Sequence, residues 1–301
     1  MNIVRFEQNP IIRPDMDAGL GENINGPSLI RVPAWVKNPL GRYYLYFAHH
    51  QGDFIRLAYA DRLEGPWRIH PPGVLALENS LFDDHIASPD VHILSNLKEI
   101  RMYYHGRSKP TSEPRPQFSR AAVSTDGLHF SAQAPRLGNA YFRAFAWDGM
   151  TYALSMPGKF YRSPDGLTGF ERGPVLFTRD MRHAAVRVRE GVLEVFYTNA
   201  GDCPESILLS FIELTPDWMK WTASPPQTVL WPEESCEGVG QPLEPSARGP
   251  VYGPARQLRD PCLFEEEGRT FLLYAVAGES GLALAEILED EPEVQAMKET
   301  R

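Results

Sequence analysis

The sequence has few cysteines and no long apolar segment. Its 301 residues include three cysteines, Cys203, Cys236 and Cys262, which are widely spaced and form no CxxC pair. Disulfide frameworks and zinc clusters need more cysteines at closer spacing, so we expect three reduced thiols without a functional role. No stretch approaches the roughly 20 apolar residues that a membrane-spanning helix requires.

A targeting signal and an excess of basic residues are also absent. The N-terminal MNIVRFEQNP lacks the basic region and long apolar segment of a secretory signal, which leads us to expect a cytoplasmic protein that does not enter membranes. With 39 acidic and 30 basic side chains, the formal net charge is -9. This charge argues against general binding to nucleic acid or anionic membranes.

Short apolar and aromatic runs, each bounded by turn residues, recur along the chain. Such runs are typical of β-strands. Five of them resemble one another: GRYYLYFAHH from Gly41, EIRMYYHG from Glu99, GMTYALSMPG from Gly149, GVLEVFYTNAG from Gly191 and GRTFLLYAVAG from Gly268. Another apolar run precedes each of the five and a third follows it, so a three-strand unit occurs five times.

Four of these units continue into a turn and a fourth run, for example STDGLHF from Ser124 and SPDGLTGF from Ser163. The fifth unit ends after GLALAEI, and IVRFEQNPII at the N-terminus can supply its missing strand. We therefore predict an all-β fold, a five-bladed β-propeller with four antiparallel strands per blade, closed by the N-terminal strand. The alternative is a β-sandwich or a two-domain β protein. The expected domain is 1–288, followed by a polar tail, 289–301.

Several of these motifs resemble a known group of enzymes. SPDV, RDPCLF, YYLYF, FLLYA and EGPW are similar to segments of the five-bladed glycosidases of glycoside hydrolase family 43 and its relatives, families 32, 68, 117 and 130. The resemblance implies a substrate funnel at the propeller axis, lined by the first strand of each blade. It also implies an Asp from the first blade as base, a second Asp that tunes pKa values, and a Glu as acid.

The first blade departs from that pattern. Aligning Gly26-Pro27 with Asp260-Pro261 puts glycine where the base of the family would stand, beside Asn25, whose amide cannot take up a proton at neutral pH. Asp90 in SPDV and Asp260 are the remaining candidates for the base. Glu237, followed by glycine on a long loop, and His183 are the candidates for the acid.

Histidines and arginines supply the predicted binding residues. Strand ends at equivalent places in different blades face the same mouth, which brings His105 together with one of His49 and His50. Further candidates stand where the first strands of the third, fourth and fifth units begin: Arg143, Arg182 and Arg259. Guanidinium groups bind carboxylate, sulfate or phosphate, so these arginines indicate an anionic substrate or a phosphate co-substrate.

No metal-binding spacing such as HExxH is present, and we expect no cofactor, although an axial structural calcium occurs in some relatives. The leading hypothesis is a glycoside hydrolase-like enzyme acting on a small sugar, which could be anionic or an anhydro sugar. The alternatives are a phosphorylase that uses phosphate, and a non-catalytic propeller that binds a glycan or a protein. The sequence leaves the oligomeric state open.

Overall fold

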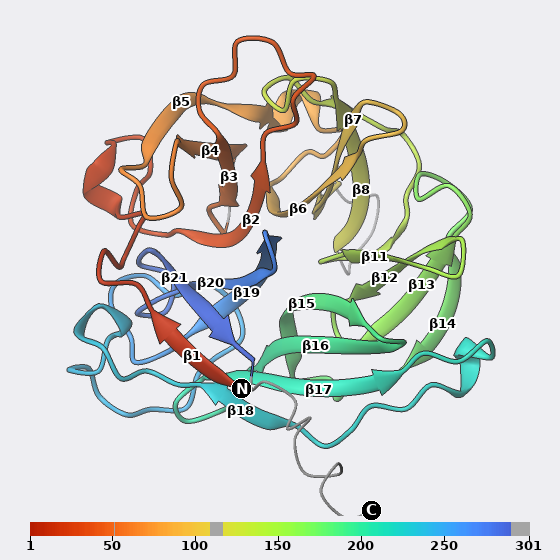
Figure 1. Ribbon diagram of the computed structural model, residues 1–301. Coiled ribbons are helices and arrows are strands. Elements are labelled where there is room, and N and C mark those ends of the chain that lie inside the picture. The colour runs from red at the N-terminus through yellow and green to blue at the C-terminus, as the bar shows by residue number, and fades with distance from the viewer. Residues whose placement is uncertain (51, 109–116, 290–301) are drawn as a thin grey trace, which may run out of the picture.

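Five antiparallel sheets form a ring around a central axis in the computed structural model, which describes residues 1–50, 52–108 and 117–289 (Figure 1). The predicted five-bladed propeller is therefore confirmed. The innermost strands, in chain order, are β2 (Asn25–Arg31), β6 (Ile86–Leu94), β11 (Arg143–Trp147), β15 (Met181–Arg189) and β19 (Arg259–Glu266). Contacts of β2 with both β6 and β19, and of β15 with β19, place these strands side by side around the axis.

Each innermost strand continues outward through its own blade. The first blade adds β3 (Tyr43–Ala48), β4 (Phe54–Ala60) and β5 (Arg68–Ala76); the second adds β7 (Glu99–Arg107), β8 (Gln117–Ser124), β9 (Ser131–Ala132) and β10 (Gly138–Asn139). The third adds β12 (Met150–Ser155), β13 (Lys159–Ser163) and β14 (Glu171–Val175); the fourth adds β16 (Val192–Asn199), β17 (Ile207–Glu213) and β18 (Gln227–Leu230). In the second blade the outer strand is divided, because β9 and β10 both pair with β8.

The fifth blade closes the ring as predicted. Its strands are β19, β20 (Arg269–Ala275), β21 (Leu282–Leu288) and the N-terminal β1 (Asn2–Arg5), which pairs antiparallel with β21. The side chain of Asn9 continues this pairing, since it donates to and accepts from the backbone of Leu284, both at 2.9 Å. The expected polar tail, 289–301, lies outside the described residues except for its first residue.

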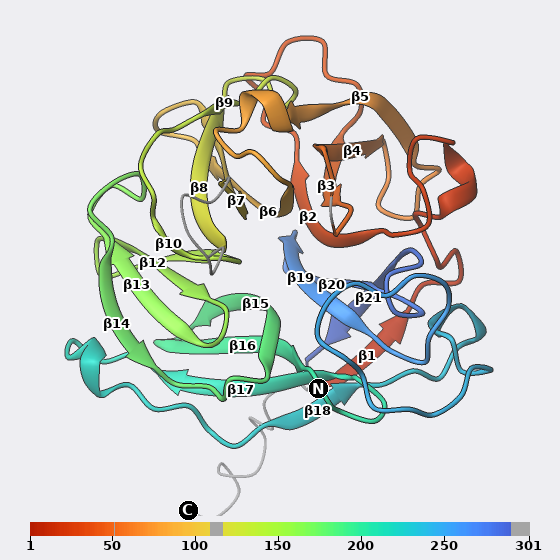
Figure 2. The same ribbon diagram turned by 180° about the vertical axis from the view of Figure 1, so that it is seen from behind.

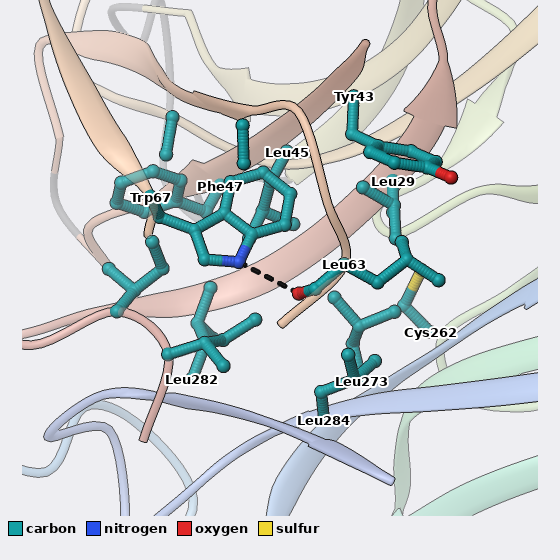
Figure 3. Packing of buried hydrophobic residues seen from close by; sticks show 14 of the residues in the cluster. Leu29, Tyr43, Leu45, Phe47, Leu63, Trp67, Cys262, Leu273, Leu282 and Leu284 are labelled. Atoms are coloured by element: carbon teal, nitrogen blue, oxygen red, sulfur yellow. Dashed lines mark hydrogen bonds between the residues drawn. The ribbon is translucent and has the colours of Figure 1, made fainter. Parts of the chain in front are cut away.

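A hydrophobic cluster fills the space between each pair of neighbouring blades. Successive residues of a middle strand point into different clusters: Leu45 packs against the fifth blade, and Tyr44 and Tyr46 pack against the second. Both faces of the strand are therefore buried, which explains continuous apolar runs such as YYLYFA where a one-sided sheet would alternate. Figure 3 shows the cluster between the first and fifth blades, where the Trp67 Nε1–H donates to Leu63 O at 3.0 Å.

The Asp-Gly turns link neighbouring blades. Asp126 accepts hydrogen bonds from the backbone N–H groups of Leu128 and His129, which fixes the turn that begins at Ser124. A tyrosine of the preceding blade then binds the turn, because Tyr46 Oη donates to Gly127 O at 2.9 Å. Tyr103 Oη donates to Gly166 O at the same distance in the next pair of blades. The repeated turn motif thus fixes the packing of adjacent blades.

Seen from behind, the segment between β18 and β19 lies over the fifth blade (Figure 2). Outside this segment, the described residues form strands, turns, short 3-10 helices and connecting loops. Among the residues that the structure describes, no helix has the length and apolar character to cross a membrane.

Candidate functional site at the propeller axis

The innermost strands share a bulge at the axial mouth. In β19, Arg259 pairs with Ala275 and Cys262 pairs with Leu273, which leaves Asp260 and Pro261 without partners in the ladder. The same two-residue bulge occurs in β2, β6 and β15, at Gly26-Pro27, Ser88-Pro89 and His183-Ala184. Bulges of this kind redirect side chains and are common next to active sites.

The third blade carries the same bulge just before β11 begins. Met156 N donates to Ala140 O at 3.1 Å, and Arg143 pairs with Leu154, so Tyr141 and Phe142 form the bulge. The first residue of every bulge has a left-handed backbone, with φ of 60° at Gly26, 52° at Ser88, 72° at Tyr141, 48° at His183 and 49° at Asp260. Left-handed conformations of non-glycine residues are strained and concentrate at functional sites. We call these five residues the axial ring.

The axial ring explains the glycine of the first blade. A Cβ on Gly26 would approach the Cα of Ser88 to 3.0 Å, so the close packing of the first two blades leaves little room for a side chain. The alignment of Gly26 with Asp260 is confirmed by the two bulges. In the second blade the aligned residue is Ser88, and Asp90 lies two residues further along the strand.

Four residues of the axial ring, Ser88, Tyr141, His183 and Asp260, line a pocket of about 830 Å³. Six of the predicted residues line it: Asn25, His50, His105, Arg182, His183 and Asp260. Sequence reasoning missed the others that carry polar chemistry: Asp84, His85, Ser88, Arg107, Gln117, Asn139, Tyr141, Arg248 and Glu279. The volume is in the range of pockets that take a small-molecule ligand.

Asp260 is the acidic member of the axial ring, and its side chain is 2% exposed. Tyr141 Oη donates to its Oδ1, and its Oδ2 lies 3.6 Å from His183 Nδ1. Burial raises the pKa of Asp260 well above the usual carboxyl range, and the negative charge of Glu279 raises it further. Burial lowers the pKa of His183 well below its usual value, and the positive charges of Arg182 and Arg259 add to this effect. Burial thus favours the uncharged form of both side chains.

Glu279 is the second buried carboxyl group of the pocket and has the opposite character. It accepts hydrogen bonds from Asn23, from Val251 N at 3.2 Å and from Arg259 Nη1 at 3.1 Å, and His50 Nδ1 lies at 3.3 Å. Burial disfavours its charged form, but the hydrogen bond with His50 and the charges of His50 and Arg259 outweigh burial and lower the pKa to about 2. Glu279 is thus a fixed carboxylate.

The pocket floor has a row of rings from three blades. The ring centroids of His85 and His105 are 6.0 Å apart, those of His105 and Tyr141 5.6 Å, and those of Tyr141 and His183 5.2 Å. Burial lowers the pKa of His105 well below its usual value, so this ring is neutral as well. The row offers apolar ring surface beside polar nitrogen atoms, a combination suited to a polar ligand with an apolar face.

The predicted arginines are largely engaged by the protein itself. Arg182 donates through Nε to Glu205 at 2.9 Å, and Arg259 Nε lies 3.3 Å from the same buried carboxylate. Arg143 donates to four backbone oxygens, including Ala184 O at 2.8 Å, and does not line the pocket. Arg182 lines the pocket, as expected, whereas Arg143 and Arg259 do not. All three guanidinium groups are bound by backbone carbonyls or by buried carboxylates.

Asp90, Glu237 and His49 do not line the pocket. Asp90 Oδ2 accepts from Ala144 N at 2.7 Å and lies 2.8 Å from His92 Nε2, so it joins the second blade to the third. Burial would raise the pKa of Asp90, but the charge and hydrogen bond of His92 outweigh it and lower the pKa. His49 and the pocket-lining His50 both follow the end of β3.

Glu237 is buried at the ring closure, away from the axis. Its carboxylate accepts from Arg5 Nε at 2.7 Å, from Tyr274 Oη at 2.9 Å, and from two backbone N–H groups. Its following residue, Gly238, has φ of 82° and a position where a Cβ would lie 2.3 Å from Ala255 O. The Glu-Gly pair is therefore explained by local packing, and a position over the mouth is not observed.

Two of the missed residues, Ser88 and Glu279, could have been found from the sequence. Ser88 stands before a proline, as Gly26 and Asp260 do, and this shared X-Pro pair aligns it with the axial ring. Applying the strand-end rule to the fifth unit, as it was applied to His105, points to Glu279 after YAVAG. Tyr141 had no such signal, because the third unit lacks the proline.

The axial residues do not suit calcium. Calcium takes six to eight oxygen ligands, mostly carboxylates and carbonyls. Within 1–50, 52–108 and 117–289, no three His, Cys, Asp or Glu side chains converge as metal ligands. Asp260 is the one carboxyl group among the five axial ring residues, and His183 offers a nitrogen ligand, so the ring does not supply the oxygen cage that calcium needs.

Comparison with known proteins places the chain among five-bladed propellers. No family model matches it. It is 35% identical to "Uncharacterized protein R118" of Acanthamoeba polyphaga mimivirus over 322 residues, which cover 95% of this chain and 90% of that protein.

Solved structures of glycoside hydrolases share the fold. The GH43 β-xylosidase/α-arabinofuranosidase CoXyl43 from a compost microbial metagenome, in complex with xylotriose, has a TM-score of 0.63 at 12% identity over 96% of both chains. A GH43_1 enzyme from Xanthomonas citri complexed with xylose has a TM-score of 0.60 at 11% identity, over 90% of this chain and 89% of that one. The GH32 β-fructofuranosidase BmSUC1 of Bombyx mori has a TM-score of 0.58 at 14% identity, over 89% of this chain but 59% of that one. The predicted resemblance in fold is thus confirmed, whereas residue roles do not transfer at such identities.

Proposed function

The chain belongs to the same protein family as the mimivirus protein R118, and from its axial pocket we propose that it is a glycosidase-like enzyme acting on a small carbohydrate. The observation that carries this proposal is the buried carboxyl group of Asp260 in the pocket, beside Tyr141 and His183, where burial raises its pKa and favours the protonated form. A carboxylic acid that keeps its proton near neutral pH can donate it to the oxygen of a leaving group. Asp260 therefore acts as the proton donor, in place of the base expected from the resemblance.

Glu279 complements this proton donor. Cleavage of a glycosidic bond passes through an oxocarbenium-like state in which the sugar ring becomes positively charged. A carboxylate whose pKa is lowered to about 2 stays negative throughout and stabilises that charge. Its lone pairs are occupied by Asn23, Val251 and Arg259, so Glu279 is poorly suited to take up a proton itself.

Asp84 is the pocket carboxylate that suits the base. Its side chain is 42% exposed, and its nearest cationic atoms, His85 Nδ1 and Arg107 Nη1, lie at 3.6 and 3.7 Å, beyond good hydrogen-bond distance. In hydrolysis, Asp84 accepts a proton from the attacking water while Asp260 protonates the departing oxygen. The bond from the anomeric carbon to that oxygen breaks, a bond to the water oxygen forms, and solvent restores both carboxyl groups.

A phosphorylase is the second candidate, and the glycine in the axial ring favours it. Phosphate attacks as an anion and needs no base, so a site without a first-blade carboxylate remains competent. Arg107 and Arg248 line the pocket and are partly exposed, unlike Arg143 and Arg259. They are the groups that would meet phosphate, or an anionic substituent of the sugar.

The test is a screen of the purified protein against aryl glycosides and neutral and acidic oligosaccharides, with and without phosphate. We expect turnover of at least one substrate and a loss of about 10²- to 10⁴-fold in kcat for Asp260→Asn. The amide keeps the size of the carboxyl group and its acceptor for Tyr141 but cannot donate an acidic proton. Wild-type turnover by Asp260→Asn would overturn the assignment, and equal rates in phosphate-free buffer would exclude the phosphorylase.

A further inference from the structure

The segment between Gly238 and Leu258 has no helix or strand, yet its central part is firmly held by buried side chains. Arg259 Nη1 donates to Gly249 O at 3.1 Å. The peptide groups of Val251 are bound on both sides, since its N–H donates to Glu279 Oε2 at 3.2 Å and its carbonyl accepts from Asn23 Nδ2 at 3.1 Å. The same buried groups therefore organise the pocket and this part of the loop.

Tyr252 follows directly and is the exposed aromatic residue of this segment. Gly249 and Pro250 line the pocket, whereas Tyr252 is 56% exposed. Its ring centroid lies 6.4 Å from that of His49, at an angle of 48°. Neither ring lines the pocket, but His49 directly precedes the pocket-lining His50, and Tyr252 follows the pocket-lining Pro250 by two residues. The two rings thus adjoin the pocket from the first and fifth blades.

We propose that Tyr252, with His49 beside it, forms a second sugar subsite at the rim of the axial pocket. An exposed tyrosine ring on a fixed backbone offers a flat apolar face and a polar hydroxyl group, and ordering it costs little side-chain entropy. The C–H face of a sugar ring has the complementary shape and polarity. The subsite rests on the proposed function and deepens it: the substrate has at least two sugar rings, one in the pocket and one on Tyr252, so the leaving group is itself a sugar.

The experiment compares binding of trisaccharides and monosaccharides, measured by calorimetry, with no dependence on turnover. The probes are xylotriose, cellotriose and trigalacturonic acid, each with its monosaccharide. Tyr252→Ala should weaken binding of the trisaccharide that the wild type binds by about 3- to 10-fold and leave the monosaccharide unchanged. Tyr252→Phe, which keeps the ring, should retain wild-type affinity. Trp231→Ala is the matched control, since Trp231 is similarly exposed at 47% but, unlike Tyr252, has no pocket-lining residue near it in the chain.

Three results would overturn the subsite. They are wild-type trisaccharide affinity in Tyr252→Ala, an equal loss for trisaccharide and monosaccharide, and no binding of any trisaccharide by the wild type. Trisaccharide binding that depends on Tyr252 but leads to no cleavage with or without phosphate would support the subsite and overturn the proposed enzyme. The two proposals therefore fail in distinguishable ways.

Discussion

Glu237 and Glu279 are both buried glutamates with 0% exposure, and each is bound by an arginine and by backbone N–H groups. They differ in place. Glu237 connects Arg5 on the closing strand to Tyr274 on β20, whereas Glu279 lines the axial pocket beside Asp260. Burial and ion pairing are thus found both at Glu237, which holds the ring closure, and at Glu279, which belongs to the candidate site. Only the position relative to the pocket distinguishes the two residues.

The largest expected effect is the loss of stability when the ion pair between Arg5 and Glu237 is removed. In Glu237→Gln, Arg5 loses its buried carboxylate partner and keeps only the half-exposed Glu233, so we expect the free energy of unfolding to fall by roughly 3 kcal/mol, the lower end for broken buried pairs. Urea titration would measure the loss, and kcat of the folded variant on any substrate found in the screen should stay at the wild-type level. A large loss of kcat with unchanged stability would instead give Glu237 a role in the site.

The second effect is the acid response of Glu279. Its folded pKa of about 2 lies below the usual value of 4.5, so its carboxylate stabilises the fold above pH 4.5, and this contribution is lost as the pH falls toward 2. The integrated loss is about 3 kcal/mol. Urea titrations between pH 6 and pH 3 should show a shallower fall in Glu279→Gln than in the wild type. Parallel curves for the two proteins would contradict the assignment of this carboxylate.

The smallest effect concerns the hydroxyl group of Tyr141. A hydrogen bond donated to Asp260 favours the ionised carboxylate, so Tyr141→Phe should raise the pKa of Asp260 further. The basic limb of the profile of kcat/KM against pH should therefore move to higher pH, with a loss of about tenfold in kcat for the missing hydrogen bond. A basic limb that does not move would show that another group controls it.

Much of the fold could be predicted from the sequence, because repeated apolar runs and Asp-Gly turns report local strand and turn formation directly. The closing strand followed from the one unit that lacked a fourth run. The candidate site was harder to predict, since burial, pairing and backbone conformation decide what a charged side chain does. Arg143, Arg182 and Arg259 begin their strands as expected, but carbonyl groups and buried carboxylates engage them. Glu279 stands at a strand end that the same rule would have pointed to, whereas Tyr141 comes from a unit whose sequence gives it no such signal.

The side chains of the axial ring determine the chemistry of the pocket, whereas other residues maintain the blades. Each of its positions is fixed by a backbone bulge, and the side chains that occupy it, from glycine to tyrosine, leave the five-bladed frame intact. The ring is therefore interchangeable in principle, position by position. Gly26 is the exception, because its contact with Ser88 couples two neighbouring positions. Placing a carboxylate in the first blade by Gly26→Asp would accordingly require the backbone of Ser88 to move, since the closest contact is to its Cα. New chemistry at this position therefore depends on how the first two blades pack.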